Sequence, residues 1–336
     1  MRAAAASLTR RLLMVVLTLL LLLAAVVLLA LSSGSGGEGL LRSLAVVLGQ
    51  GAPDTAMETI IWRIRLPRAL IAALAGGALS LGGLVFQALL RNPLAEPYIL
   101  GVSGGSAIGA ILGILLGLSR FPGVSACAFL GSLATLALIV AMSAGRSVLK
   151  NDALLLSGVM VNAFCAAVIM FLISITQDAR LHNIIFWLMG DLSSADGRTA
   201  VILTAVLLPC FGAVFLFSHA LNLLLMGNDM AQSMGLPLRS VTVLLLVVTS
   251  LMVSAVVSFS GLIGFVGLVI PHLLRFLLGP DHRILVPACI LGGGAYLTLC
   301  DVLARVLPEQ GEMPAGVITA LIGAPLFIFL LRRTRR

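Results

Sequence analysis

The feature that most constrains this chain is a set of apolar runs, each about 20 residues long, that recurs from one end to the other. Helical runs of that length cross the roughly 30 Å hydrocarbon layer of a bilayer, in which every backbone polar group must be paired within the protein. Hydrophobic residues make up 60% of the chain and charged residues only 10%, which excludes a soluble fold. Stretches such as 12–31 and 241–257 do not alternate, which excludes a β-barrel.

The runs predict one all-α, polytopic membrane domain over residues 1–336. About ten transmembrane helices are expected, near 12–32, 67–90, 100–118, 122–144, 153–175, 199–218, 240–259, 262–278, 284–304 and 314–331. An even number puts both termini on one side, and the terminal arginines place that side in the cytoplasm. The first run is longer than the core of a signal peptide, so we expect it to be an uncleaved span.

Two stretches between spans have their own expected structure. Residues about 181–190, within an otherwise polar outer loop, predict a short amphipathic helix at the membrane interface. Residues about 222–239 fall on the cytoplasmic side, where a turn at Gly227 and Asn228 precedes a short helix from about Asp229 to Met234. Gly235 and Pro237 then end that helix.

The third span carries glycine at every fourth position, which places five glycines on one helical face: Gly101, Gly105, Gly109, Gly113 and Gly117. Such a face lets a second helix approach closely within the membrane. Tight packing inside the subunit is the favoured interpretation, and lining of a wide pathway is the alternative.

The charged and metal-binding residue types exclude several functions. The net charge of +8 is scattered singly between apolar runs, which argues against nucleic-acid binding. The five cysteines lie in apolar stretches without CxxC spacing, so no metal site is expected. Among the four histidines, only His182 on the outer interfacial helix is a candidate for contact with a transported molecule; packing is favoured for the others.

The chain lacks the residues that would drive transport or catalysis by itself. There is no GxxxxGK[ST] phosphate loop, and Lys150 is the only lysine, so ATP and Mg²⁺ would be used by a partner subunit. The expected spans are nearly free of the ionisable residues that coupled carriers keep near mid-membrane. Asp301 and Arg305, four residues apart, are expected to pair on one helix face. We expect a transport subunit that is not an enzyme and binds no cofactor.

Four segments together resemble the permeases that import iron-siderophores, haem and cobalamin, a group of large type II ABC importers. They are RLPR at 65–68, RNPLAEPYILGVSGG at 91–105, GLIGFVGLVIPHLLR at 261–275 with DHR at 281–283, and MPAGVITALIGAPLFIFLL at 313–331. The resemblance implies a ten-helix subunit of the bacterial inner membrane that pairs with a second permease copy, as a homodimer or a heterodimer. It also implies two ABC ATPase subunits and a periplasmic binding protein.

The resemblance assigns roles to three groups of residues. It implies that Arg65, Arg68 and Arg305 form an exposed cationic rim that docks acidic residues of the binding protein; snorkelling to lipid phosphates is the alternative. It implies a cytoplasmic gate at Asn92, Leu94 and Asn151, with a plain turn as the alternative. It also implies that the cytoplasmic loop rests on the ATPase through Gly227, Asp229, Ala231, Met234, Gly235 and Leu236, so that Ala231→Asp should uncouple import while leaving folding intact.

The resemblance leaves the cargo open among several metal chelates. An iron complex, carried by a siderophore or haem, is ranked first, and cobalamin or another metal chelate is the alternative. A stand-alone secondary carrier or channel is the alternative from a different class, and transport by the purified chain without an ATPase would distinguish it.

Overall fold

A computed structural model describes residues 2–33, 45–46, 55–143, 151–308 and 311–334. The described chain is helical throughout, which confirms the expected all-α fold. The longer helices are α1 (Arg2–Ser32), α4 (Leu66–Leu89), α5 (Val102–Leu115), α6 (Ser125–Ser143), α7 (Asn151–Ser174), α9 (Gly197–Leu216), α12 (Leu238–Ser260), α13 (Val266–Leu278), α14 (His282–Val306) and α15 (Ala315–Thr334). The shorter ones are α3 (Thr55–Thr59), α8 (Asp178–Leu188), α10 (Ser218–Leu225) and α11 (Asn228–Ser233).

Eight of the described helical segments are long and apolar enough to cross a membrane. The predicted spans 100–118 and 262–278 correspond instead to the shorter helices α5 and α13, of 14 and 13 residues. Each begins after a residue in the left-handed backbone region, Gly101 and Phe265 respectively. Residues 261–265 before α13 are irregular, whereas α5 follows a short 3-10 helix at Pro97–Leu100 and ends at Leu115. The sequence pattern alone therefore overestimated both lengths.

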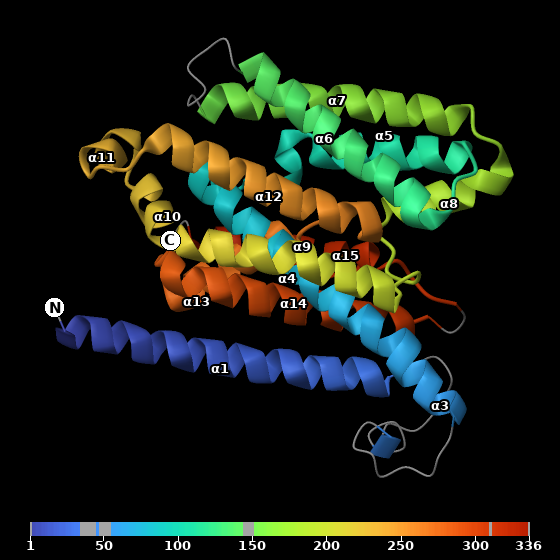
Figure 1. Ribbon diagram of the computed structural model, residues 1–336, viewed down its shortest axis with the longest axis horizontal. Coiled ribbons are helices and arrows are strands. Elements are labelled where there is room, and N and C mark those ends of the chain that lie inside the picture. Colours follow the sequence, from blue (N-terminus) through green and yellow to red (C-terminus); the bar gives the residue numbers. More distant parts are fainter. Residues whose placement is uncertain (1, 34–44, 47–54, 144–150, 309–310, 335–336) are drawn as a thin grey trace.

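The helices are arranged around α4, which packs against α9, α12, α13 and α14 (Figure 1). Helices α5 to α8 form a group on one side of this centre, and α1 lies along the other side against α14. Helix α1 begins, and α15 ends, at the same end of the molecule, where α10 and α11 also lie. The opposite end carries α3 and α8. We refer to it as the outer end, because the sequence predicts that the segment now seen as α8 lies outside the membrane.

Small residues allow α4 to approach its neighbours at backbone distance. A side-chain carbon added at Gly83 would overlap the carbonyl of Gly267 in α13, and one added at Gly76 would overlap the carbonyl of Gly293 in α14. In a membrane, where lipid is as apolar as the protein interior, such close packing holds helices together by van der Waals contact. These contacts fix the centre of the fold.

The glycine face of the third span is used in the same way along part of its length. Gly105 and Gly109 lie against the backbone of α6, at Gly131 and Cys127. Gly113 lies near Val124, where α6 is about to begin, while Gly101 and Gly117 flank the helix in left-handed conformations. The structure thus places Gly105 and Gly109 between α5 and α6 of one subunit.

Candidate functional site

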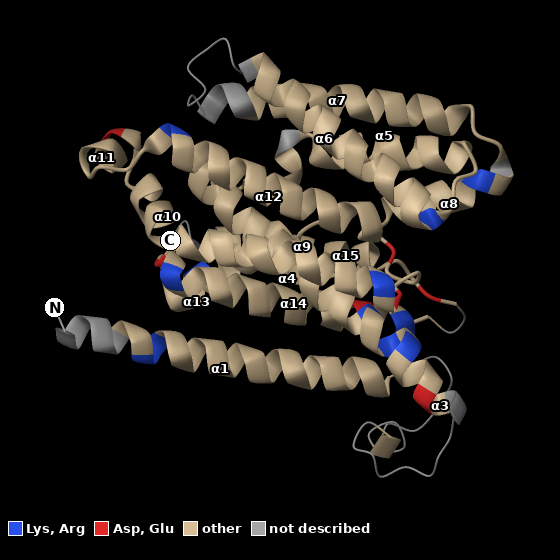
Figure 2. Ribbon diagram, viewed as in Figure 1, with Lys and Arg blue, Asp and Glu red and all other residues tan. Residues whose placement is uncertain are grey.

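One group of arginines at the outer end lies where α4 begins and α14 ends (Figure 2). The guanidinium of Arg68 donates through Nε to both carboxylate oxygens of Asp301, at 3.0 and 3.1 Å. Its Nη1 donates to Glu312 at 2.6 Å. Arg305 pairs with the same Asp301 at 3.2 Å, which confirms the expected pair four residues apart. One fully buried carboxylate is therefore shared by two arginines.

Two of these arginines also bind the end of α1. Arg305 donates to the carbonyl oxygens of Ser33 and Ala30, at 3.1 and 3.3 Å. Arg65 donates to the carbonyl oxygen of Leu31 at 2.9 Å. The last carbonyls of a helix have no partner within it and carry partial negative charge. The arginines therefore satisfy the end of α1 and fasten it to α4 and α14.

The expectation of an exposed cationic rim is wrong for these side chains. Arg65, Arg68 and Arg305 are only 8%, 7% and 6% exposed, while Arg63 is the exposed arginine of the segment. The reason is that Asp301 is buried and the end of α1 needs donors, and neither fact is visible in the motif.

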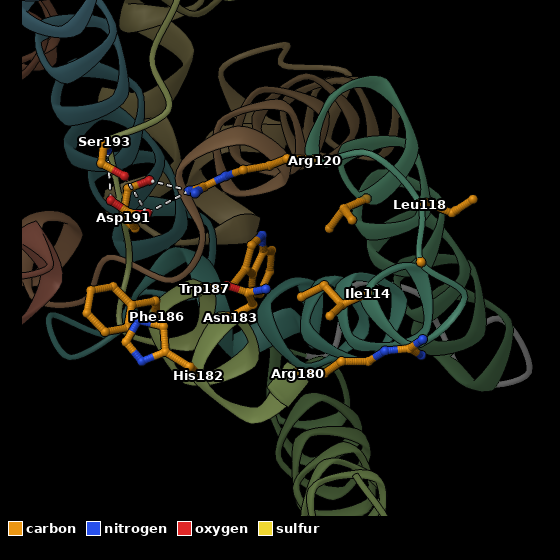
Figure 3. Close-up of a pocket in the computed structure, with 12 residues that line it drawn as sticks. Ile114, Leu118, Arg120, Arg180, His182, Asn183, Phe186, Trp187, Asp191 and Ser193 are labelled. Atoms are coloured by element: carbon orange, nitrogen blue, oxygen red, sulfur yellow. Dashed lines mark hydrogen bonds and ion pairs between the residues drawn. The ribbon is translucent and has the colours of Figure 1, made fainter. Parts of the chain in front are cut away.

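A cavity of about 590 Å³ opens at the outer end between α5, the start of α6 and α8 (Figure 3). The labelled residues around it include positive, amide and aromatic side chains: Arg120, Arg180, His182, Asn183, Phe186 and Trp187. His182 is exposed and its ring lies 4.3 Å from that of Phe186. The interfacial helix expected at 181–190 is thus α8, and it carries His182 on a wall of this cavity.

An ion pair between Arg120 and Asp191 separates this cavity from a neighbouring one of about 290 Å³, since both residues line both cavities. Arg120 Nη2 lies 2.9 Å from the Asp191 carboxylate, which also accepts from the backbone and hydroxyl of Ser193 at 2.7 and 2.8 Å. Burial opposes ionisation of Asp191, but the bonds from Ser193 and Arg120 outweigh it and lower the pKa of the carboxyl. No pattern in the sequence predicts this pair, because its members lie 71 positions apart.

The loop expected on the cytoplasmic side folds as α10 and α11. Ala231 is completely buried against the core, so the expectation that Ala231→Asp leaves folding intact is wrong, because a charge would be placed in an apolar interior. Three methionines of this loop are exposed, Met226, Met230 and Met234, at 56%, 49% and 57%. Asp229 and Gly235 are exposed as well, Leu236 is half-buried, and Gly227 precedes α11 in a left-handed conformation.

The residues expected at a cytoplasmic gate lie between α4 and α5 and at the start of α7. The side-chain oxygen of Asn92 accepts a hydrogen bond from the backbone of Leu94 at 2.9 Å, which stabilises a turn. The Leu94 side chain is 49% exposed. Asn151 begins α7, and its side chain lies outside the described residues.

Sequence reasoning missed Asn222 and Glu312. Asn222 accepts a hydrogen bond from the backbone of His282 at 2.9 Å and donates to Asp281, also at 2.9 Å. The DHR segment at 281–283 was the available signal, since an aspartate before an apolar run is typical of a helix start. Glu312 precedes the last span and has no comparable pattern. Within the described residues, no group of three His, Cys, Asp or Glu side chains could hold a metal ion.

Comparison with known proteins identifies the chain's relatives. Residues 20–333 match the FecCD transport family. A vitamin B12 import system permease protein, BtuC, from Salmonella arizonae is 42% identical over 281 residues, covering 83% of this chain and 84% of the relative. The protein of the same name from Citrobacter koseri is 40% identical over 309 residues, covering 88% and 93%.

Two solved structures share the fold. One is described as an inward-facing conformation of a metal-chelate type ABC transporter; it is 34% identical, with a TM-score of 0.85 over 95% of this chain and 98% of that one. The other, PsaBC from Streptococcus pneumoniae in complex with Fab, is 19% identical with a TM-score of 0.58 over 82% and 93%, and shows the fold alone. The resemblance found in the sequence is thereby confirmed: this chain belongs to the FecCD transport family and is a multi-pass permease of the ABC importer type.

Proposed function

We propose that the chain is the membrane-spanning permease subunit of an ATP-driven importer of cobalamin. The observation that carries this is the 40–42% identity to permeases named for vitamin B12 import, over more than four fifths of both chains. The sequence analysis ranked an iron complex first among the possible cargoes, whereas these relatives favour cobalamin. Cobalamin, the alternative then, becomes the main hypothesis, and an iron-siderophore or haem becomes the alternative.

The proposed assembly contains two permease copies, two ABC ATPase subunits on the cytoplasmic side and a periplasmic binding protein on the outer side, in a bacterial inner membrane. Both termini would be cytoplasmic, in line with the ends of α1 and α15 lying beside α10 and α11. The exposed methionines Met226, Met230 and Met234 support contact between this loop and the ATPase, because methionine is flexible and suits apolar docking surfaces. ATP and Mg²⁺ would be bound by the ATPase.

The binding protein would dock at the outer end, where Arg63, Arg65, Arg68 and Arg305 gather positive charge. Cationic surfaces steer acidic partners and fix their register, and salt weakens the effect. Because Arg65 and Arg68 are buried, Arg63→Glu is the better charge reversal: it should weaken docking at low salt without breaking the ion pairs of Asp301. Cargo released there would meet the cavity that His182 lines.

The cargo is tested by import into proteoliposomes that contain the permease, its ATPase and the binding protein that co-purifies with them. We expect ATP-dependent uptake of cyanocobalamin that exceeds uptake of haem or of a ferric hydroxamate siderophore. Uptake of an iron chelate without uptake of cyanocobalamin would favour the alternative cargo. Uptake by the permease without the ATPase would instead indicate a stand-alone carrier and overturn the proposal.

A further inference from the structure

The two carboxylates bound to Arg68 differ sharply in their access to solvent. The Asp301 side chain is 1% exposed and is shared with Arg305, whereas the Glu312 side chain is 37% exposed. Removing the buried carboxylate would leave two arginines without their partner in an apolar setting, which is strongly unfavourable. An ion pair that reaches solvent exchanges partners at little cost, because water can replace either member.

The residue before Glu312 stands in open space, and the residue after it is anchored to α14. Gly311 has a left-handed conformation with nothing within 4 Å of where a side-chain carbon would stand. Beyond Glu312, the backbone nitrogen of Met313 donates to Ala304 at 3.0 Å, which ties the segment to α14 just before α15 begins. The Glu312 carboxylate can therefore leave Arg68 while the backbone behind it stays attached.

The contact between Arg68 and Glu312 shows that Arg68 binds a carboxylate at the outer end. The Nη1 atom of Arg68 holds a carboxylate oxygen at 2.6 Å, on the solvent side of a cluster whose other arginines are bound to Asp301 and to the end of α1. A carboxylate supplied by a partner would form the same charge-assisted bond. We propose that Glu312 occupies the position on Arg68 that an acidic side chain of the docking binding protein takes, so that docking exchanges one carboxylate for another.

This inference rests on the proposed function in one respect, that a binding protein docks at the outer end. It adds that Glu312 competes with that protein and weakens its affinity. The outer end therefore selects for a partner whose acidic side chain reaches Arg68. A partner without such a side chain leaves Glu312 in place and gains nothing from the arginine.

The test compares Glu312→Gln with Glu58→Gln, an exposed acid of α3 at the same end, so that both variants change the net charge equally. The intact transporter is held in lipid nanodiscs, and the co-purifying binding protein is the probe in surface plasmon resonance at low salt. We expect Glu312→Gln to lower Kd on the order of three- to tenfold and Glu58→Gln to change it less than about twofold. Glu312→Asp, which keeps the charge, should stay near wild type.

Arg63→Glu distinguishes a failure of the carboxylate exchange at Arg68 from a failure of docking at the outer end. If Arg63→Glu weakens docking but Glu312→Gln and Glu58→Gln give the same Kd, the proposed carboxylate exchange is wrong and docking at this end stands. If Arg63→Glu and Glu312→Gln both leave Kd unchanged at low salt, docking at this end is wrong and the exchange falls with it. A structure of the docked complex with Glu312 still on Arg68 would overturn the exchange directly.

Discussion

Asn222 of α10 is bound to Asp281, the residue before α14: the Asn222 side-chain nitrogen donates to the Asp281 carboxylate at 2.9 Å. The side-chain oxygen of Asn222 accepts from the backbone of His282 at 2.9 Å. Bonds from Arg283, and a weaker one from Asn222, lower the pKa of Asp281 to about 2, so it is charged at neutral pH. The loop expected to face the ATPase is thereby joined to the start of a central helix.

Asn222→Ala should therefore weaken both stability and coupling. It leaves the Asp281 carboxylate and the first turn of α14 short of partners, at a cost of about 1–3 kcal/mol in the free energy of unfolding. Import per ATP hydrolysed should fall in the assembled transporter. Ser233→Ala, an exposed residue whose hydroxyl bonds to Met230 within α11, is the control and should change neither quantity. Thermal unfolding in detergent and parallel import and ATPase assays measure the two effects, and wild-type values for Asn222→Ala would contradict the link.

The parts of the fold that depend on local pattern could be predicted from sequence. The lengths of the apolar runs predicted most of the membrane helices. The turn at Gly227 predicted the position of α11 to within about one residue. The lengths of α5 and α13 could not be predicted, because residues 116–118 after α5 and residues 261–265 before α13 are as apolar as the helices. Only the packed structure shows where their backbones leave the helical conformation.

The residue types of the candidate site could be predicted from sequence, but the burial and the bonding partners of those residues could not. The motif placed Arg65, Arg68 and Arg305 at one end, but their burial depends on Asp301 and on the end of α1, which are distant in sequence. The sequence around Ala231 includes the polar residues Asp229 and Gln232 and gives no sign that Ala231 is buried. Its burial comes from the helices behind α11, which no local pattern records.

Met234→Asp should uncouple ATP hydrolysis from import while the permease remains folded. Met234 is 57% exposed on the cytoplasmic loop, so a charge there stays in water yet removes an apolar contact offered to the ATPase. Ala231→Asp provides the contrast, since it buries a charge and should lower the melting temperature or abolish expression. The decisive comparison is import relative to ATPase activity in proteoliposomes, and coupled import at the wild-type level by Met234→Asp would count against this surface.

Gly83→Ala should destabilise the helix centre much more than Gly212→Ala. The added methyl at Gly83 meets the carbonyl of Gly267, so α4 and α13 must separate, and overpacking of this kind costs typically about 1–3 kcal/mol. Gly212 on α9 has nothing within 4 Å, so alanine there should be neutral or raise stability by roughly 0.5–1 kcal/mol. Equal unfolding midpoints for the two variants in a detergent titration would show that the close approach is not required.

The bonds around Asp191 predict a pH-dependent contribution to stability. The pKa of Asp191 is lowered in the folded protein, so its contribution is fully present above the unfolded value of about 3.9 and is lost as pH falls through the folded pKa. The melting temperature of Asp191→Asn should lie below that of wild type by a constant amount from about pH 5 to 8, and the gap should close below about pH 4. Asp229→Asn, an exposed carboxylate on α11, is the control and should show a smaller gap at every pH. A gap that persists undiminished at pH 3 would mean that packing, and not charge, carries the effect.

The exposed Leu94 offers a direct test of the proposed cytoplasmic gate. Asn92 holds the turn before α5 through its bond to the Leu94 backbone, which leaves the Leu94 side chain 49% exposed at the end opposite α3 and α8. The variant Leu94→Cys is made in a transporter whose native cysteines are replaced by serine or alanine. If two copies bring these turns together across the pathway, Leu94→Cys should form an oxidative cross-link between the two subunits. Import should then fall by more than about tenfold and recover on reduction, because a covalent bridge prevents the gate from opening. Leu116→Cys, 73% exposed at the outer end, is the matched control for oxidation itself and should leave import unchanged. Efficient cross-linking at position 94 with undiminished import would reduce the NPLAEP segment to a plain turn.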